Sequence, residues 1–482
     1  MKKFQFSKLG SLFRNSFYYG LGNLVQKFLS VILLPIYTRY LAPDDYGVVA
    51  LVTILTMIIG TLCMCGLTNG ISRYFYYTDK ENITEDEVIW TPLSFIIIFS
   101  LVLCSVLIFK STSISIFLLD NDSYSYHITL AILTVILSNI YSVGHSVLIF
   151  QEKVFFVNVI TIINVLIGAL LGIIFVVYME RGLAGIYESA LITNCIISII
   201  IFFTVIRNFK FKFNLNLLQK QLRFSLPLMT AVFCFFLIDS SDRYMLKIFL
   251  PLSEVGFYNI GYQIGLLMMI FVGGFTAAFP PYYHKNNQNG EGQSICNDVL
   301  NIYLLVSLPF LVLISYFGPV AIKILTPIEF HQSVTVISLV AMAYMLKGPY
   351  VIFLMGLLMK NKTKWQLYIE IVAAMTNLIL NYLLIPIVGR EAAALTTVLS
   401  YLIMVIISYI LVMKVNPLRN LNIIKPASFF ITVSFVSCIS LTITNNYNLI
   451  FLGLFFTIIS IVISFFSSKA SINNILNNSS ID

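Results

Sequence analysis

The sequence predicts an all-α integral membrane protein with about 14 transmembrane helices. Of its 482 residues, 59% are hydrophobic and only 10% are charged, and the mean hydropathy is +0.92. In soluble domains, roughly a quarter of the residues are charged. Apolar runs of about 20 residues recur along the chain, a length that matches the roughly 30 Å hydrocarbon core of a bilayer. Because the polar stretches between them are too short for a soluble catalytic domain, we expect the chain to act within the membrane.

Apolar spans bounded by polar breaks give the predicted helices in chain order. They occupy 15–38, 46–70, 88–109, 126–149, 154–178, 183–206, 224–249, 255–280, 298–318, 332–357, 366–388, 392–413, 426–442 and 447–467. The basic start MKKFQFSKLGSLFR leads into the first span without a small-residue cleavage pattern. We therefore expect the first helix to be retained and not to be removed as a signal peptide.

Lysine and arginine are distributed unevenly between the two sides of this arrangement. Of the 29, twenty fall on the side of the N-terminus, seven fall on the opposite side, and Lys27 and Lys347 lie within spans. Cytoplasmic loops carry such an excess, so both termini are predicted to be cytoplasmic. The same bias accounts for the net charge of +8, which gives no reason to expect a nucleic-acid partner.

The seven cysteines and four histidines show no spacing typical of a metal or redox site. Cys63 and Cys65 lie two positions apart, so their side chains point to different faces of a helix. We expect neither a metal nor another cofactor.

Comparison of the chain with itself at an offset of 209 residues reveals an internal repeat. The superposed pairs include Arg14 with Arg223, Asp45 with Glu254, Lys153 with Lys362 and Arg181 with Arg390. This predicts a six-helix lobe at 1–207, a basic cytoplasmic linker at 208–222, a second six-helix lobe at 223–414, and two added helices with a cytoplasmic tail at 415–482. An even number of helices gives both lobes one orientation, with a pseudo-two-fold axis along the membrane normal.

Three segments carry a family resemblance: LLPIYTRYLAPDDYGVVALVTIL (33–55), GLTNGISRYFYY (66–77) and DRYMLKIFLPLSEVGFYNIGYQIG (242–265). They resemble the Wzx-type flippases, the polysaccharide-exporting branch of the MOP superfamily. The resemblance covers nearly the whole chain and implies a MATE/MOP-like fold with alternating access about a central cavity.

For function, the resemblance implies a transporter and not an enzyme. Its substrate would be an undecaprenyl-diphosphate-linked oligosaccharide, carried to the outer leaflet of the bacterial inner membrane for O antigen, capsule or a related polymer. Candidate partners are a polysaccharide polymerase and a chain-length regulator.

Ionisable residues inside spans are the candidate site residues, because they usually face a bundle interior. On a regular seventh helix, Asp239, Arg243 and Lys247 are spaced i, i+4 and i+8 with Asp242 beside them, so all four share one narrow face. The positions 209 residues earlier, in the first half, are uncharged. Because a charge needed only for the architecture would recur in both halves, this difference favours contact with an asymmetric ligand. The alternative is an Asp239–Arg243 pair between packed helices, with Lys247 reaching the outer interface.

Other cations extend the predicted substrate path. Lys27, in the middle of the first span, is predicted to line it, or else to form a structural interhelical bond. Arg73 either anchors the second span or receives a phosphate, and Arg14 and Arg223 at the cytoplasmic rim either anchor the interface or guide the lipid diphosphate. The predicted path has a net charge of about +2, which suits a diphosphate; it comprises Lys27, Arg73, Arg243, Lys247, Asp239 and Asp242.

Three acidic residues are candidates for coupling transport to a proton or sodium gradient, namely Asp239, Glu188 and Glu370. A buried carboxyl group beside other acids can change its protonation state, which is what proton coupling requires. The alternative for Glu188 and Glu370 is a hydrogen-bonded role in packing.

Three other functions remain open from the sequence. One is a multidrug or cation antiporter of the same superfamily. Twelve helices and an acidic, cation-binding lobe would suit that function, whereas fourteen helices and a net basic path do not. A peptidoglycan-precursor flippase fits fourteen helices, and charge alone does not exclude it. A membrane-embedded polysaccharide polymerase or ligase commonly has a large extracytoplasmic loop, whereas the outer loops predicted here are short.

Overall fold

The computed structural model describes residues 25–26, 28–76, 83–287, 292–359, 363–415, 439, 452 and 454–459. Over these residues the secondary structure is helical, without β-strands, as predicted. Nine of the described helices are long and apolar enough to span a membrane, and the bent pair Leu252–Gly265 and Met268–Tyr283 makes a tenth. Most of the predicted spans 426–442 and 447–467, and much of the first, lie outside the described residues.

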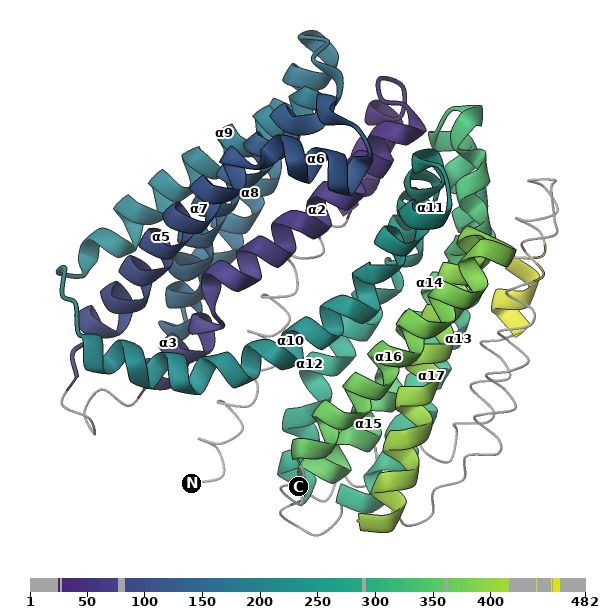
Figure 1. Ribbon diagram of the computed structural model, residues 1–482. Helices are drawn as coiled ribbons and strands as arrows, with labels where there is room; N and C mark the ends of the chain where they lie inside the picture. The colour runs from purple at the N-terminus through teal and green to yellow at the C-terminus, as the bar shows by residue number, and fades with distance from the viewer. Residues whose placement is uncertain are drawn as a thin grey trace. The chain divides into compact units, whose positions relative to one another are not determined.

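The chain divides into two compact units, Met1–Phe233 and Cys234–Asp482. The helices of unit 1 are α2 (Pro43–Met64), α3 (Leu67–Phe75), α5 (Glu85–Phe109), α6 (Ser111–Leu119), α7 (Ser125–Phe150), α8 (Val154–Ile173) and α9 (Gly182–Thr204). Within this unit α7 packs against α5 and α9 (Figure 1). A π-helical turn, Ile174–Tyr178, extends α8.

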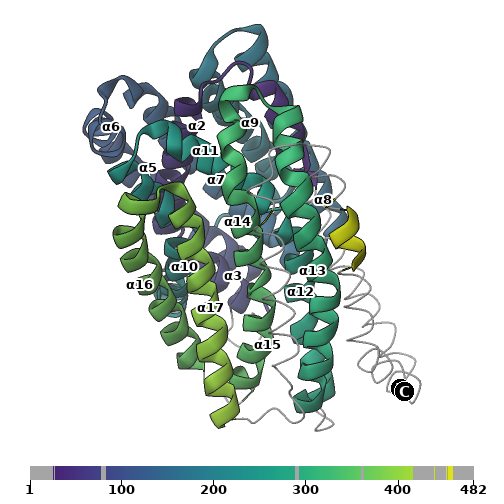
Figure 2. The same ribbon diagram turned by 90° about the vertical axis from the view of Figure 1, so that its right-hand side faces the viewer.

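The boundary between the units lies inside α10 (Leu215–Phe249). Unit 2 continues with α11 (Leu252–Gly265), α12 (Met268–Asn287), α13 (Gly292–Leu325), the 3-10 segment η4 (Ile328–Val336), α14 (Ile337–Met345), α15 (Lys347–Leu358), α16 (Thr363–Val388) and α17 (Arg390–Val415). Helices α16 and α17 lie side by side, and α17 also packs on α14 and α15 (Figure 2).

Local sequence signals explain where several helices begin. A capping box starts α5, where the Thr84 hydroxyl accepts from the Glu87 N–H at 3.4 Å and the Glu87 carboxylate accepts from the Thr84 N–H at 2.9 Å. In α10, the Asn214 side chain accepts from the Leu217 N–H at 3.2 Å. Because Leu217 and Leu218 are buried, the helix begins at Leu215, within the linker predicted at 208–222.

Besides the predicted span 255–280, which the bent pair α11 and α12 forms, two predicted spans are divided by breaks. The predicted helix 46–70 ends at Cys65 and Gly66, which both have left-handed φ angles of 47° and 66°, and α3 begins after them. A Cβ at Gly66 would lie 2.8 Å from the Ser225 carbonyl oxygen, so this position requires glycine on steric grounds as well. The predicted helix 332–357 is built from η4, α14 and α15, with a break at Leu346.

Gly265 allows α11 to pack closely on α14. A Cβ at this position would lie 2.8 Å from the Ile337 carbonyl oxygen and 2.7 Å from Val340 Cβ. Because one of these contacts is with backbone, we expect Gly265→Ala to destabilise unit 2 by about 1–3 kcal/mol, as overpacked positions do. The thermal unfolding midpoint of the full chain in detergent measures this. Gly273→Ala is the matched control, since a Cβ there meets nothing within 4 Å; equal losses in both variants would contradict the close packing.

Candidate functional site

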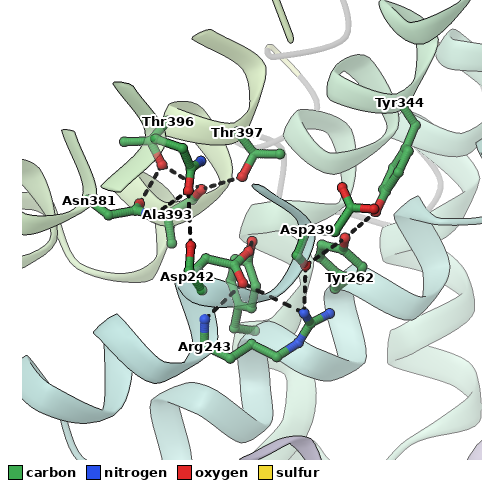
Figure 3. A network of polar contacts seen from close by, with 12 residues as sticks. Asp239, Asp242, Arg243, Tyr262, Tyr344, Asn381, Ala393, Thr396 and Thr397 are labelled. Carbon is green, nitrogen blue, oxygen red and sulfur yellow. Dashed lines mark hydrogen bonds and ion pairs between the residues drawn. The ribbon is translucent and has the colours of Figure 1, made fainter. Parts of the chain in front are cut away.

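The four charged residues in the C-terminal half of α10 belong to unit 2, namely Asp239, Asp242, Arg243 and Lys247. Asp242 is fully buried and Arg243 is 8% exposed, whereas Asp239 and Lys247 are partly buried. The surrounding elements are α11, α14, α16 and α17, which contribute tyrosine, asparagine and threonine side chains (Figure 3). A charged face that would be costly in lipid is therefore covered by polar and aromatic groups of the same unit.

The Asp242 carboxylate is held from two sides. The Tyr258 hydroxyl donates a hydrogen bond to Oδ2, and Nη1 of Arg243 lies 3.6 Å from Oδ1. The Arg243 backbone N–H also donates to Oδ1, at 2.8 Å. A buried carboxylate needs such partners, because an unpaired charge in this environment is strongly unfavourable.

Arg243 does not form the ion pair with Asp239 that the sequence offered as an alternative. Its guanidinium forms the ion pair with Asp242, and Nη1 donates to the backbone carbonyl of Asp239 at 2.9 Å instead of to that residue's carboxylate. The guanidinium carbon lies 4.1 Å from the centroid of the Tyr262 ring, a cation–π contact. The carboxylate of Asp239 instead accepts from the Tyr401 hydroxyl at 2.8 Å.

A neutral hydrogen-bond network continues from α10 into α16 and α17. The Ser241 hydroxyl donates to Asn377 Oδ1 at 3.2 Å, and Asn381 Nδ2 donates to the same oxygen at 3.0 Å. Thr396 in turn donates to Asn381 Oδ1 (Figure 3). These contacts fix the face of α10 against its neighbours. They could not be read from the sequence, because each partner is more than 100 residues away from α10 along the chain.

Lys347 and Glu370 join this cluster. The carboxylate of Glu370 is buried and accepts from Tyr350 at 3.0 Å and from Gln366 at 2.9 Å. Lys347 interacts electrostatically with both Asp239 and Glu370. The sequence shows Lys347 only as a lysine within a predicted span. The signal available was the Gly348 and Pro349 pair that follows it, at the start of α15 and next to the break at Leu346. The cluster thus holds three carboxylates and two cations.

The other predicted site residues lie elsewhere. Arg73, at the end of α3, is exposed, and its guanidinium lies 4.4 Å from the ring centroid of Phe224 within unit 1. Arg223 is exposed, and Lys247 is in the last turn of α10. Lys27 and Arg14 lie outside the described residues.

Glu188 forms an ion pair at one end of unit 1. Arg181 Nη2 lies 2.5 Å from Glu188 Oε1, and the Tyr126 hydroxyl donates to the same oxygen at 2.9 Å. Both oxygens of this carboxylate are therefore engaged, since Arg181 Nε donates to the second at 3.1 Å. Within the described part of the chain, no three His, Cys, Asp or Glu side chains are arranged to hold a metal ion.

A cavity of about 650 Å³ opens within unit 1. Its walls come from α2, α3, α7, α9 and Met229 of α10. Serine, threonine and asparagine side chains alternate there with apolar ones, and none of the described residues that line it carries a charge. The charged cluster and this uncharged cavity thus belong to different units.

Two units of membrane-spanning helices, one with an uncharged cavity and the other with a buried charged cluster, define a polytopic membrane transporter fold. Solved structures of the MOP superfamily share it. The lipid II flippase MurJ in an inward closed conformation matches with a TM-score of 0.72 and 15% identity, covering 93% of this chain and 99% of that chain. An inward-facing multidrug resistance MATE family transporter matches with a TM-score of 0.68 and 13% identity, over 82% and 95%.

The chain belongs to the polysaccharide biosynthesis protein family, whose sequence profile matches residues 12–286. It is also 24% identical over 315 residues to the Lsg locus protein 1 of Haemophilus influenzae, covering 63% of this chain and 74% of that protein. The predicted family and MATE/MOP-like fold class are thereby confirmed. This family and these folds are those of transporters and flippases and not of enzymes.

Proposed function

We propose that this protein is a flippase for undecaprenyl-diphosphate-linked oligosaccharide repeat units. It carries them from the cytoplasmic to the outer leaflet of the bacterial inner membrane, with both termini cytoplasmic, for O antigen or another surface polysaccharide. The observation that carries this proposal is the buried Arg243 cluster, which a family member of this kind would use to bind a phosphate-bearing substrate. A polymerase and a chain-length regulator are the proposed partners downstream.

Arg243 has donors left for an anionic ligand. Its hydrogen bond and ion pair in the described part of the chain both use Nη1, whereas a guanidinium carries five N–H groups, three of them on Nε and Nη2. The side chain also keeps 10% exposure. A diphosphate that reaches these donors during the transport cycle would gain charge-assisted, two-pronged hydrogen bonds, which lysine does not supply in the same geometry.

Reconstitution tests the proposal directly. The full chain in liposomes should move a fluorescent undecaprenyl-diphosphate-linked oligosaccharide between leaflets, measured as the fraction protected from a membrane-impermeant quencher. Liposomes with heat-denatured protein are the control. Exchange no faster than in that control, for every glycan in a panel of repeat units, would overturn the proposal.

Asp239 is the residue we propose for ion coupling, because it is partly buried, shares the Lys347 charge with Glu370 and sits beside Arg243. One elementary charge crossing 100 mV releases about 2.3 kcal/mol, so coupling can stimulate net flipping until the ratio of the glycan between the leaflets shifts by up to about 50-fold. We expect Asp239→Asn to lose this stimulation by an imposed proton or sodium gradient while keeping gradient-free exchange.

Glu188→Gln is the matched control for Asp239→Asn, since its carboxylate is already engaged by Arg181 and Tyr126. This variant should keep the stimulation. If Asp239→Asn responded to both gradients like the wild type, coupling would not pass through Asp239.

A further inference from the structure

The cavity of unit 1 offers hydrogen-bond acceptors without charge. Several of its hydroxyl groups donate to carbonyl oxygens of their own helices: Thr53 to Val49, Thr56 to Thr53, Thr134 to Leu130, Ser138 to Val135 and Ser142 to Ser138, at 2.7–2.9 Å. All five hydroxyl-bearing residues line the cavity. Because each hydroxyl hydrogen is occupied, the lone pairs that remain can only accept.

These acceptors come from two facing helices. Thr53 and Thr56 are on α2, and Thr134, Ser138 and Ser142 are on α7, which packs against α2. Their spacing along α7 is i, i+4 and i+8, so three hydroxyl groups form one row. Acceptors on two neighbouring helices that line one cavity match a ligand that presents several O–H or N–H donors.

Apolar groups also line this cavity. Met57, Val135 and Ile186 line the same space, as does Tyr187. The Tyr187 side chain is 7% exposed, and within the described residues its hydroxyl has no hydrogen-bond partner. Alternating apolar faces and polar edges are the surface of a sugar ring. A volume of about 650 Å³ falls within the range of roughly 300–1,000 Å³ that small-molecule sites occupy.

We propose that this cavity binds an uncharged sugar of the transported glycan. The assignment rests on the proposed flippase function and adds a selectivity to it. A sugar carboxylate in the cavity would lose water without gaining a cationic partner, because none of the described lining residues is charged, and an unpaired charge is strongly disfavoured there. The described walls of the cavity therefore favour neutral sugars over acidic ones, and we expect the diphosphate to bind elsewhere.

Removal of two acceptors tests this site without changing its shape. The double variant Thr56→Val and Ser138→Ala should flip a lipid-linked neutral disaccharide about 30-fold more slowly, because two lost hydrogen bonds of about 1 kcal/mol each amount to about 2 kcal/mol. The control is Thr204→Val with Thr376→Val; Thr204 is exposed and Thr376 is partly buried, both donate to a carbonyl of their own helix four residues earlier, at 2.7 and 2.8 Å, and neither lines the cavity. The control should flip like the wild type. Membrane abundance and monodispersity in detergent show that all chains are folded.

A second substrate tests the selectivity. The same lipid-linked disaccharide with one hexose replaced by a hexuronic acid should be flipped at least about tenfold more slowly by the wild type. Equal rates for both substrates, or a double variant equal to the control, would overturn the cavity assignment while leaving the flippase function standing.

A direct binding measurement distinguishes the proposed sugar site from the proposed flippase function. Equilibrium dialysis of the full chain in nanodiscs against a radiolabelled neutral methyl disaccharide measures the cavity without transport. If the double variant loses binding and the control keeps it, the sugar site is supported. If the same protein also flips none of the lipid-linked glycans, the flippase function is overturned. Equal binding by the double variant and the control would overturn the sugar site.

Discussion

Arg243→Ala should reduce flipping by at least about 100-fold and also destabilise unit 2. The substitution leaves Asp242, which is fully buried, without its cationic partner 3.6 Å away. Removing one member of a buried pair costs about 3–5 kcal/mol because the other charge stays uncompensated. It also removes the cation–π contact with Tyr262 and the donors proposed for the diphosphate. The measurements are the flipping rate in liposomes and the unfolding midpoint in detergent.

Stability and transport are separated by a second variant. Arg243→Met with Asp242→Asn removes both charges and keeps similar volumes, so we expect unfolding close to that of the wild type, as neutral replacements of buried pairs often show. Flipping should remain as low as in Arg243→Ala. A stable double variant with wild-type flipping would show that Arg243 serves the fold alone.

Arg390→Ala should destabilise the chain by about 3 kcal/mol, whereas Arg181→Ala should cost about 1 kcal/mol or less. The two arginines superpose in the predicted repeat, at the offset of 209 residues, yet their surroundings differ. Arg390 is 10% exposed and donates to Glu254 at 2.6 Å and to Gln332 and Thr335 at 3.3 Å. The side chain of Arg181 is 52% exposed, so solvent screens its pair with Glu188.

Unfolding midpoints of the two full-length variants under identical detergent conditions give this comparison. Each variant serves as the other's control, since the residue type, the substitution and the repeat position are the same. Equal losses would mean that burial does not decide the strength of these pairs.

The repeat itself predicted which residues are equivalent but not how they pair. At the 209-residue offset, Arg181 and Asp45 correspond to Arg390 and Glu254. Arg390 does bind Glu254, but Arg181 binds Glu188, whose counterpart is the uncharged Thr397. Glu188, seven residues from Arg181, competes with the distant Asp45 for this arginine. A comparison of the sequence with itself does not show which of the two acids will form the ion pair.

Span positions were the most predictable part of the fold, because apolar runs and polar breaks follow directly from the bilayer's thickness. The breaks within spans were not predictable. Cys65 adopts a left-handed φ of 47°, and nothing in an apolar stretch of the sequence identifies a non-glycine residue that does so. The early start of α10 was also missed, since Leu217 and Leu218 are buried by contacts that only the folded unit provides.

The candidate site was predictable in its charges and not in their partners. Asp239, Asp242 and Arg243 stand out because ionisable residues are rare in apolar spans. The tyrosines that bind them, Tyr258 and Tyr401, look like any of the 27 tyrosines of the chain. Side-chain pairing depends on which helices meet, and a hydropathy pattern does not contain that information.

The different partners of the two repeat-related arginines also bear on the order of synthesis. Arg181 and Glu188 are seven residues apart, so they can pair as soon as α9 leaves the ribosome. Glu254 and Arg390 are separated by 136 residues, and at about 5–20 residues per second the carboxylate waits roughly 7 to 27 s for its arginine. During that interval α11 has been synthesised but has not yet formed its ion pair with α17. Folding of the second unit therefore depends on a helix that is synthesised late.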